Sequence, residues 1–270
     1  HINSTAITSI ALISIEDPQE YGIAEIDASL QIKRFREKPA PGEIFSNLAS
    51  TGIYVCNPKI FEFIPKNTKF DFAKDLFPLL MDKGHIIRGW LARGNWTDVG
   101  NPIMLREAEK WMLQRNSTTR MSGSINITDA HISGPVSFEN NVSLGSGTRV
   151  VGPVHIGSDT SIGNDVIIGP YTCIGNGVNI KNNSKIFSSS IYNGVVIGSN
   201  TTISGSIIDN NAVISDNCSI EHNTVVGFKS VIHNNVTIHS GTRVWHDVDI
   251  PEGTIIKEHV INKKYDINNK

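Results

Sequence analysis

The sequence predicts two structures in succession, a mixed α/β domain and then a parallel β-helix. Three observations support this prediction. A six-residue repeat of apolar residues begins at Ile132 and, with one slip, continues to Ile256. The residues before about 118 lack this repeat and contain apolar runs of strand and helix length instead. A polar segment over 116–124 separates the two patterns, so we divide the chain into domains at 1–118 and 119–270.

The repeat contains two series of residues. Large apolar residues recur every six positions from Ile132 to Ile186 and again from Ile208 to Ile256. Four positions after each of them comes a small or β-branched residue, and Gly, Asn, Asp and Ser, which tolerate tight turns, fill the positions between. Three such hexads would close a triangular coil of about 18 residues, stacked on the next coil at about 4.8 Å. This pattern is the hexapeptide repeat of parallel β-helices.

The repeat slips between Ile186 and Ile208, through the segment 188–194. We expect one irregular coil or a short protruding loop there. Stacked coils leave unpaired strand edges at both ends, so we expect the preceding domain to cap one end and the tail Lys257–Lys270 to cap the other. Flat β-helix faces favour self-association, and we therefore expect a homo-oligomer.

The first domain (domain 1, residues 1–118) has the sequence patterns of alternating strands and helices. The segments with a clear expectation are, in order, a strand over 7–15, a hairpin of 21–27 and 31–36 around Ala28 and Ser29, a strand over 52–56, a short helix from Pro58 to Ile64, a helix from its N-cap Asp71 to Lys83, and a helix from Pro102 to about Arg115. Pro78 disturbs the geometry of the helix after Asp71. Asn101 followed by Pro102 is a typical helix start.

Composition excludes several classes of function. The chain has 24 Lys and Arg against 26 Asp and Glu, a formal net charge of −2, which leaves no basic surface for nucleic acid or an anionic membrane. No apolar run approaches the ~18–20 residues that span a bilayer, and the start does not resemble a signal peptide, so we expect a soluble cytoplasmic protein. Cys56, Cys173 and Cys218 form no C-x-x-C pair, and we expect all three to be reduced and structural.

Short motifs in domain 1 suggest chemistry through their order rather than singly. They read, along the chain, Tyr-Gly-x-x-x-x-Asp from Tyr21, Phe-x-Glu-Lys-Pro from Phe35, Ser-Asn-x-Ala-x-Thr-Gly-Ile-Tyr from Ser46, Asp-Phe-x-Lys-Asp-Leu-Phe-Pro from Asp71, and Trp-x-Asp-Val-Gly-x-Pro from Trp96. Taken alone, a Glu-Lys pair is usually a solvated surface pair, and a Trp-x-Asp turn usually serves packing.

This series closely resembles the second half of the nucleotidyltransferase domain of sugar-1-phosphate nucleotidyltransferases, also called NDP-sugar pyrophosphorylases. The resemblance covers nearly the whole chain, because in this family a Rossmann-like domain is often followed by a left-handed β-helix. It implies that domain 1 is the C-terminal half of a Rossmann-like domain and that the β-helix is left-handed. The chain looks most like mannose-1-phosphate guanylyltransferases and archaeal-type glucose-1-phosphate nucleotidyltransferases. The segment 241–246 resembles their Gly-Val-x-x-Trp-Pro, with His246 in place of proline.

The resemblance implies a sugar-phosphate pocket. Gly22 would let the backbone approach the hexose ring, and Glu37 would accept hydrogen bonds from its hydroxyls. Lys38 would hold the phosphate as a compact positive charge. Thr51 and Gly52 would line the sugar side.

The implied reaction is an in-line attack of the sugar-1-phosphate oxygen on the nucleotide α-phosphorus, which releases pyrophosphate. Asp98 would be one ligand of Mg²⁺, a hard cation that prefers carboxylate and phosphate oxygen. Lys38 and Asp98 would be the catalytic residues, acting by positioning and charge neutralisation. The partners implied are a hexose 1-phosphate and a nucleoside triphosphate.

The chain departs from the family at its front. The Gly-rich loop with Gly-Thr-Arg, a downstream Lys-Pro and the Asp that shares the metal with Asp98 are absent, and no G-x-G-x-x-G or G-x-x-x-x-G-K-[ST] occurs. We therefore interpret the sequence as part of a longer enzyme. The alternative is a non-catalytic, regulatory or sugar-binding homologue.

A third interpretation is a β-helix acyl- or acetyltransferase with a histidine base. Its candidates lie within or beside the repeats, namely His155, His222, His233, His239 and His246. For a nucleotidyltransferase, these motifs do not specify the base of the nucleotide or the identity of the hexose. We favour mannose 1-phosphate with GTP over glucose 1-phosphate with dTTP, UTP or ATP.

Overall fold

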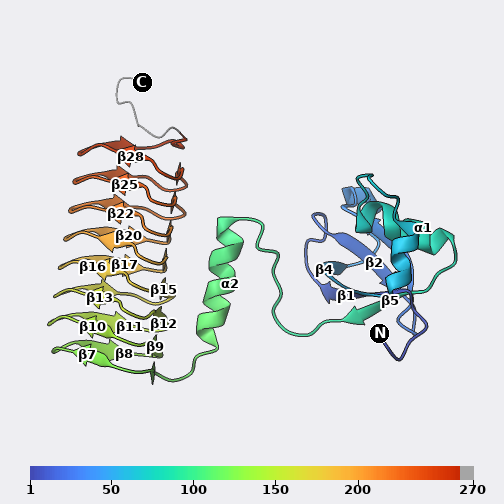
Figure 1. Ribbon diagram of the computed structural model, residues 1–270, viewed down its shortest axis with the longest axis horizontal. Helices are drawn as coiled ribbons and strands as arrows, with labels where there is room; N and C mark the ends of the chain where they lie inside the picture. Colours follow the sequence, from blue (N-terminus) through green and yellow to red (C-terminus); the bar gives the residue numbers. More distant parts are fainter. Residues whose placement is uncertain (262–270) are drawn as a thin grey trace. The chain divides into compact units, whose positions relative to one another are not determined.

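The computed structural model describes residues 1–261 and divides into two compact units, the first over His1–Asp98 and the second from Val99 onward. Figure 1 shows a sheet with short helices in the first unit, and a helix beside a stack of coils in the second. The predicted fold class, a mixed α/β region followed by a parallel β-helix, is confirmed.

The first unit is built on a five-stranded sheet with the strand order β3-β2-β4-β1-β5. The strands are β1 (Thr8–Ser14), β2 (Gly22–Ile26), β3 (Ile32–Glu37), β4 (Leu48–Cys56) and β5 (Ile87–Leu91). Strand β1 pairs antiparallel with β4 and parallel with the edge strand β5, and β2 and β3 form the predicted hairpin. Asp27 closes that hairpin, because its Oδ1 accepts hydrogen bonds from the backbone of Ser29 (2.9 Å) and Gln31 (3.0 Å).

One face of this sheet carries the core and the short helices. The helices are η1 (Pro41–Glu43), η2 (Pro58–Phe63), the π-helical turn η3 (Phe72–Leu76) and α1 (Phe77–Asp82). Phe77 is fully buried and makes edge contacts with the rings of Phe35, Tyr54 and Phe72, at centroid distances of 5.0–6.0 Å. This aromatic cluster holds η3 and α1 against β3 and β4.

The segment after Asp71 is not the single regular helix that the sequence predicts. Asp71 is its N-cap, as expected, and accepts hydrogen bonds from the backbone of Ala73 and Lys74, both at 2.8 Å. The first turn is π-helical, and α-helical geometry begins only at Phe77. Pro78 explains the break, because proline has no N–H to donate and is tolerated only in the first turn of an α-helix.

The opposite face of the sheet is open over β4, β1 and β5. Ile53 and Val55 of β4 and Trp90 of β5 are 59%, 53% and 61% exposed. Together with Ala11 of β1 they line a shallow, mostly apolar cavity of about 570 Å³. The apolar side chains of the first unit therefore lie on both faces of the sheet, although only one face carries the helices.

The second unit is a parallel β-solenoid of about eight coils. Within the described residues its short strands form three eight-stranded parallel sheets, named here the β6, β7 and β8 walls after their first strands. The β6 wall contains β6 (Arg120–Met121), β9 (Val136–Phe138), β12 (Val154–Ile156), β15 (Thr172–Ile174), β18 (Ser190–Ile191), β21 (Ile207–Ile208), β24 (Val225–Val226) and β27 (Arg243–Val244).

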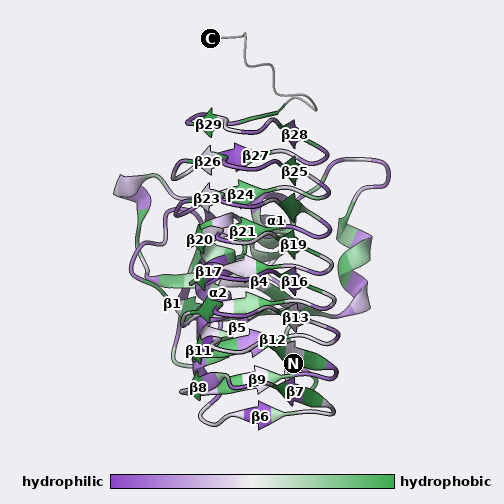
Figure 2. Cartoon of the chain, turned by 90° about the vertical axis from the view of Figure 1, so that its left-hand side faces the viewer, coloured by the Kyte–Doolittle hydropathy of each residue, from purple (hydrophilic) through white to green (hydrophobic). Residues whose placement is uncertain are grey.

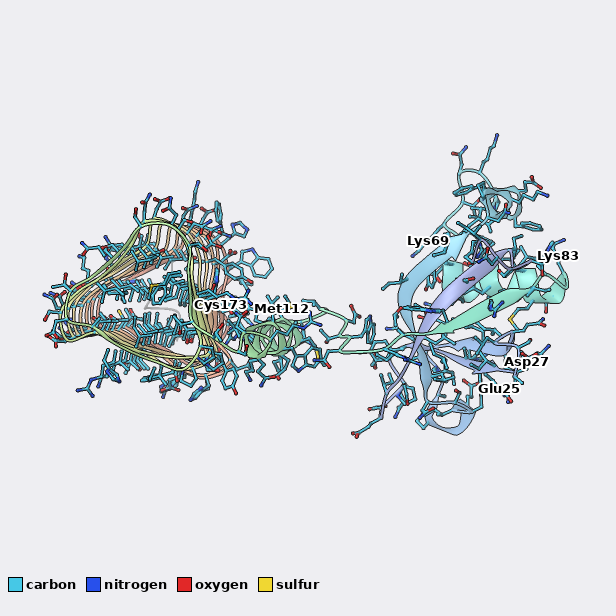
Figure 3. All side chains as sticks on the ribbon, turned by 90° about the horizontal axis from the view of Figure 1, so that it is seen from below. Glu25, Asp27, Lys69, Lys83, Met112 and Cys173 are labelled. Atoms are coloured by element: carbon cyan, nitrogen blue, oxygen red, sulfur yellow. The ribbon has the colours of Figure 1, made fainter. Side chains whose placement is uncertain are left out.

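The β7 wall contains β7 (Ile125–Ile127), β10 (Val142–Leu144), β13 (Ser161–Ile162), β16 (Asn179–Ile180), β19 (Val196–Ile197), β22 (Val213–Ile214), β25 (Val231–Ile232) and β28 (Asp249–Ile250). The β8 wall contains β8 (His131–Ser133), β11 (Arg149–Val151), β14 (Ile167–Ile168), β17 (Lys185–Phe187), β20 (Thr202–Ser204), β23 (Ser219–Ile220), β26 (Thr237–Ile238) and β29 (Ile255–Ile256). Seen along the stack, the coils form a rounded triangle filled with side chains (Figure 3).

Both series of the predicted repeat point into this triangle. Every large apolar position named from Ile132 to Ile256 is buried, except Ile132, which is half-buried at the first coil. Figure 2 shows many strands coloured as hydrophobic and most turns between them as hydrophilic. The small residues of the second series do more than fit the bends. Their hydroxyls donate hydrogen bonds to carbonyls of the next coil, for example Thr148 to Gly163 (2.7 Å), Thr160 to Gly175 (2.9 Å) and Ser230 to Trp245 (2.7 Å).

The slip in the repeat consists of two short steps and no protruding loop. The inward residues Ile186 and Ile191 are five positions apart, and so are Ile203 and Ile208, whereas Ile191 and Ile203 are joined by two regular steps of six. All of these isoleucines are buried. Both short steps fall at the corner where the β8 wall leads into the β6 wall, so one residue is missing from that corner in each of two successive coils.

Helix α2 (Pro102–Gln114) begins where the sequence predicts, with the Asn101 side chain accepting a hydrogen bond from the backbone of Met104 at 3.0 Å. It packs along the β6 wall and belongs to the second unit (Figure 1). The compact units therefore meet at Asp98 and Val99, twenty residues before the boundary that we placed at 118 from sequence alone.

The C-terminal tail pairs with the last coil of the β6 wall. Val260 pairs with Val244, so the tail covers the edge of β27 up to this point, and residues 262–270 lie outside the described part. Cys56, Cys173 and Cys218 are free, and burial raises the pKa of the Cys173 thiol to about 12. Over residues 1–261, no helix combines the length and hydrophobicity that crossing a bilayer requires.

Candidate functional site

The residues that the sequence singled out lie around one cavity in the first unit. This cavity, here called the Glu37 pocket, has a volume of about 540 Å³. Its lining residues are Glu20, Tyr21, Gly22, Glu37, Lys38, Ser50, Thr51, Gly52, Tyr54, Phe70, Asp71, Phe72, Ala73, Trp96 and Asp98. All six predicted site residues, Gly22, Glu37, Lys38, Thr51, Gly52 and Asp98, are among them. The sheet brings together segments that are up to 76 positions apart in the sequence.

Gly22 and Glu37 face each other on the hairpin, as paired residues of β2 and β3. A Cβ atom on Gly22 would lie 2.6 Å from Oε2 of Glu37 and 2.6 Å from Cζ of Phe35. Such a contact is far inside van der Waals distance, so no side chain larger than hydrogen fits there without moving one of these groups. The absent side chain of Gly22 thus leaves room for the Glu37 carboxylate, in addition to any role in admitting a hexose.

The Glu37 carboxylate lies in an environment that disfavours its charge. Partial burial raises its pKa above the ordinary value of 4.5, and the nearby negative charge of Asp71 raises it further. The positive charges of Lys38 and Lys74 act weakly in the opposite direction. Burial likewise raises the pKa of Tyr54, although a hydrogen bond with Ser50 opposes this. The pocket therefore presents two carboxylates as hydrogen-bond acceptors, the partly buried Glu37 and the exposed Asp71.

Lys38 lies at the rim of the pocket with an unusual backbone. Its φ angle is +44°, in the left-handed region that non-glycine residues rarely adopt, and it precedes Pro39, which normally favours extended backbone. Its N–H donates to the Tyr21 carbonyl at 3.1 Å, which ties the residue to the end of β2. Its Nζ lies 3.4 Å from a carboxylate oxygen of Glu20, and both side chains are more than half exposed. The ammonium group is held loosely, so it is free to turn toward an anion.

Thr51 and Gly52 form the bulge of β4. The register between β1 and β4 shifts here, so that the three residues 51–53 lie opposite Ala11 alone. The Thr51 hydroxyl donates to the Ala11 carbonyl at 3.0 Å, and the residue is buried. Gly52 has a φ angle of +77° and open space where a Cβ would lie. The Thr51 hydroxyl is thus used by the fold, and the exposed Gly52 backbone is what this bulge offers to the pocket.

Asp98 lies at the open side of the pocket and is exposed. The preceding loop is held by Trp96, whose ring meets the ring of Tyr21 edge-on at 5.4 Å between centroids. In residues 1–261, no group of three or more His, Cys, Asp or Glu side chains is placed to hold a metal ion. The carboxylate of Asp98 suits Mg²⁺ as one ligand, and no cluster of three such side chains lies around it in this part of the chain.

Sequence reasoning missed several members of the pocket. Asp71 was assigned only as a helix N-cap, yet it lines the pocket and its charge acts on Glu37. Ser50, Tyr54 and Phe72 also line it. All four lie inside the motifs already noted, so the motif from Asp71 carried a signal for Asp71 and Phe72. Their orientation toward the pocket depends on how β4 and η3 pack.

Four of the five candidate histidines of the solenoid pair with acidic residues, and the fifth, His222, is exposed. These pairs are His155 with Glu139 (3.7 Å), His233 with Asp249 (2.9 Å), His239 with Glu221 (3.1 Å) and His246 with Asp247 (3.0 Å). Three of them join neighbouring coils, so their evident role is to link one coil to the next.

Comparisons with known proteins agree with both halves of the fold. A family model described as nucleotidyl transferase matches residues 1–115, and one described as the EIF2B subunit epsilon LbH domain matches residues 134–238. A UTP--glucose-1-phosphate uridylyltransferase of Synechocystis sp. is 30% identical over 171 residues, which cover 57% of this chain and 44% of that protein. Glucose-1-phosphate adenylyltransferases of Bacillus thuringiensis and Bacillus anthracis are each 32% identical over 130 residues, which cover 45% of this chain and 34% of theirs.

The chain spans less than half the length of these curated relatives. The order of its two parts is the one that the motifs predict, with the pocket residues in the first match and the repeats in the second. Residues 1–115 therefore match a nucleotidyl transferase domain and residues 134–238 match an LbH domain of the EIF2B epsilon type, and part of the chain is similar to enzymes named glucose-1-phosphate nucleotidyltransferases.

Proposed function

We propose that the protein acts as a sugar-1-phosphate nucleotidyltransferase, which joins a hexose 1-phosphate to a nucleoside triphosphate and releases pyrophosphate. The observation that carries this proposal is that acceptors suited to sugar hydroxyls, Glu37 and Asp71, and a cation suited to a phosphate, Lys38, line the same pocket. The names of the relatives support glucose 1-phosphate as the sugar substrate. Mannose 1-phosphate with GTP, which the motifs favour, remains the competing prediction.

In this proposal, each polar group of the pocket has a separate task. Glu37 accepts hydrogen bonds from hydroxyls of the hexose, and the space beside Gly22 keeps its carboxylate in place. Lys38 turns from Glu20 to the phosphate, replacing one exposed ion pair by a contact with a doubly charged group. The contact between Tyr21 and Trp96 positions the loop that bears Asp98.

The chemistry requires one bond to form and one to break. A phosphate oxygen of the hexose 1-phosphate forms a bond to the α-phosphorus of the nucleotide, while the bond from that phosphorus to the pyrophosphate oxygen breaks. Lys38 would hold the attacking phosphate in line, which is the main requirement of such a transfer. Mg²⁺, with Asp98 as its ligand from this part of the chain and phosphate oxygens as others, would neutralise charge on the phosphates.

The sugar-phosphate half of this proposal is testable with the chain in hand. Calorimetric titration with glucose 1-phosphate, mannose 1-phosphate and inorganic phosphate measures affinity for the pocket directly. Glu37→Gln should lower the affinity for both sugar phosphates at least tenfold and leave the affinity for inorganic phosphate unchanged. Lys38→Met should lower the affinity for all three ligands. Lys33→Met is the matched control, because Lys33 is on β3, the strand that ends just before Lys38, but pairs with Asp27 at 3.0 Å outside the pocket. If neither sugar phosphate binds, the proposal is wrong.

Turnover separates the proposed reaction from the alternatives. The assay measures pyrophosphate release from each hexose 1-phosphate combined with each of GTP, dTTP, UTP and ATP, with Mg²⁺ and with a chelator. Binding without release would favour the non-catalytic, sugar-binding homologue. Consumption of acetyl-CoA with an amino sugar, and loss of it in His239→Gln, would favour the acyltransferase interpretation. A cytoplasmic location and a homo-oligomer formed through the β-helix remain predictions of this proposal.

A further inference from the structure

Helix α2 docks on a wall that repeats itself. Successive strands of the β6 wall are paired in register, so a helix lying along this wall meets a similar surface at each coil, about every 4.8 Å. Apolar contacts alone have no direction and would distinguish poorly between neighbouring positions along the stack. Something else must therefore select the coil on which α2 rests.

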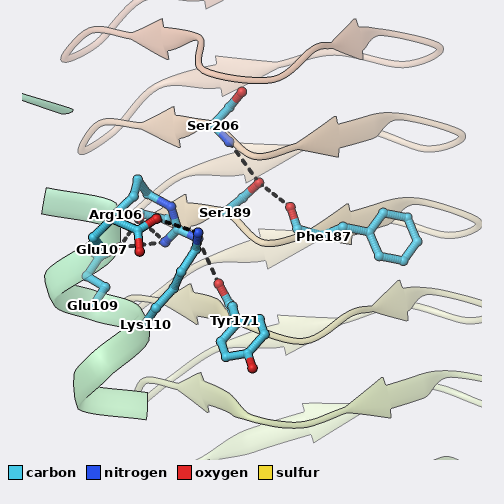
Figure 4. Close-up of polar contacts among 9 residues, drawn as sticks. Arg106, Glu107, Glu109, Lys110, Tyr171, Phe187, Ser189 and Ser206 are labelled. Carbon is cyan, nitrogen blue, oxygen red and sulfur yellow. Dashed lines mark hydrogen bonds and ion pairs between the residues drawn. The ribbon is translucent and has the colours of Figure 1, made fainter. Parts of the chain in front are cut away.

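The interface contains one buried, charged group that makes directional contacts. Arg106 of α2 is 7% exposed. Its Nη1 donates to Oε2 of Glu109 (2.5 Å) and to Oγ of Ser190 (2.6 Å), and its Nη2 donates to the Tyr171 carbonyl (2.7 Å). The Ser190 hydroxyl in turn donates to Glu109. Figure 4 shows the Arg106 side chain reaching from the helix to the coil of Tyr171.

Ser190 is distinctive among its neighbours. The outward positions next to it on the β6 wall are Cys173 on one side and Ile207 on the other. Neither can accept from Arg106 and donate to Glu109 as a hydroxyl does. Arg106 and Glu109 both belong to α2, so a shift of the helix by one coil would keep their ion pair. It would remove the Ser190 hydroxyl from the buried guanidinium and the partly buried carboxylate, which is unfavourable.

The coil that presents Ser190 is also one of the two shortened coils. Its corner is held by Ser189, whose hydroxyl donates to the Phe187 carbonyl (2.7 Å) and accepts from the backbone of Ser206 (3.2 Å) in the next coil (Figure 4). The break in the six-residue repeat and the polar contact with α2 thus fall at the same height of the solenoid. The irregularity distinguishes two successive coils from the others, and Ser190 lies on the first of them.

We propose that Arg106, Glu109 and Ser190 form a register lock, which selects the coil of the solenoid on which α2 docks. The lock determines where on the solenoid the chain arriving from the first unit is anchored. Arg106 and Ser190 are positioning residues in this proposal, and the apolar contacts of α2 supply the docking itself.

Two double variants of the same helix test the proposal. Arg106→Met with Glu109→Leu replaces the buried ion pair, and Glu107→Leu with Lys110→Met replaces the other i, i+3 ion pair of α2 (2.6 Å), which is more exposed, by the same residue types. Spin labels carried by unnatural amino acids at Gln114 and Lys257, both exposed, report the position of α2 along the stack through their distance distribution.

We expect a single distance in the wild-type protein and in the Glu107/Lys110 control. The Arg106/Glu109 variant should show at least one further population, displaced by about 5 Å, the height of one coil. A single unchanged distance in this variant would overturn the proposal. A broad distribution from a detached helix would also overturn it, because the ion pair would then supply docking rather than register.

Exchanging two residues moves the hydroxyl that contacts Arg106 to the neighbouring coil and leaves the composition of the chain unchanged. Ser190→Ile combined with Ile207→Ser places the hydroxyl one coil closer to Lys257. The distance from Gln114 to Lys257 should then shorten by about 5 Å as one population. If α2 stays at its original coil in the exchange variant, Ser190 does not select the register. Peptides of the solenoid that keep their protection from hydrogen exchange would establish that the coils themselves remain folded.

Discussion

The carboxylate of Glu37 occupies the space in which a side chain on Gly22 would lie. The two residues are partners across the β2–β3 hairpin, and the ring of Phe35 closes the same space from the other side. A glycine that sequence reasoning assigned to contact with a sugar is therefore required first by the wall of the pocket. This relationship connects the hairpin register directly to the position of the group that would read the hexose.

Gly22→Ala should damage the pocket more than it damages the fold. The added Cβ would lie 2.6 Å from both Glu37 Oε2 and Phe35 Cζ, so the carboxylate must move. We expect affinity for the preferred sugar phosphate to fall at least tenfold, with a loss of about 1–3 kcal/mol in the free energy of unfolding. Titration and urea unfolding measure the two effects. Gly42→Ala is the control, since nothing lies within 4 Å of its Cβ position, and equal effects of the two substitutions would contradict the argument.

Because Lys38 has a left-handed backbone, replacing it by glycine should raise the free energy of unfolding while it lowers the affinity for phosphate. Lys38→Gly removes the strain at φ +44° together with the charge, whereas Lys38→Met removes only the charge. The glycine variant should gain up to about 1 kcal/mol of unfolding free energy over the methionine variant, because a left-handed residue with a Cβ costs about 1–2 kcal/mol and glycine loses part of this gain through its unfolded state. Both variants should lose phosphate binding. A glycine variant no more stable than the methionine variant would show that the backbone at residue 38 is not strained.

Two threonines of the solenoid should respond oppositely to loss of their hydroxyls. Thr160 Oγ1 donates to the Gly175 carbonyl at 2.9 Å, whereas the buried Thr172 Oγ1 has no partner in the described structure. Thr160→Val should lower the free energy of unfolding by about 1–2 kcal/mol, and Thr172→Val should leave it unchanged or raise it by up to about 1 kcal/mol. Chemical denaturation followed by circular dichroism measures both. If Thr172→Val is as harmful as Thr160→Val, the Thr172 hydroxyl has a partner such as an internal water.

Glu37 should make the stability of the first unit fall as the pH rises. Burial, and then the charge of Asp71, raise its pKa in the folded protein above the ordinary 4.5. Between these two values the folded state binds more protons than the unfolded state, so the contribution of Glu37 is complete below pH 4.5 and is lost as the pH rises through the folded pKa. Urea unfolding from pH 4 to 7 should show this slope in the wild type and a smaller one in Glu37→Gln.

Asp71→Asn provides a partial control for the same effect. Asparagine can still accept the hydrogen bonds from Ala73 and Lys74, so the cap remains while the charge beside Glu37 is removed. The pH dependence should shrink but persist, because burial is the larger cause of the shift. An unchanged slope in both variants would mean that another group is responsible.

The sequence by itself determined the solenoid and six of the residues that line the pocket. Each coil uses the same residue types at the same positions. The six-residue period therefore predicts which large apolar residues point inward, and all of them except Ile132 are buried. The hairpin at Asp27 and the helix start at Asn101 follow from local turn and capping chemistry. The resemblance of the ordered motifs to a known family also implied a shared pocket, and the six residues it named line one cavity.

Only the tertiary structure decided how these parts are used. That Gly22 makes room for Glu37 depends on strand register, that Asp71 acts on Glu37 depends on how η3 packs, and both are contacts between segments distant in sequence. The slip of the repeat looked like an irregularity in the sequence, whereas in the structure it coincides with the coil that holds Arg106. A periodic sequence predicts the features that all coils share. It does not predict which coil α2 contacts, because that choice depends on a directional contact between residues far apart in the sequence.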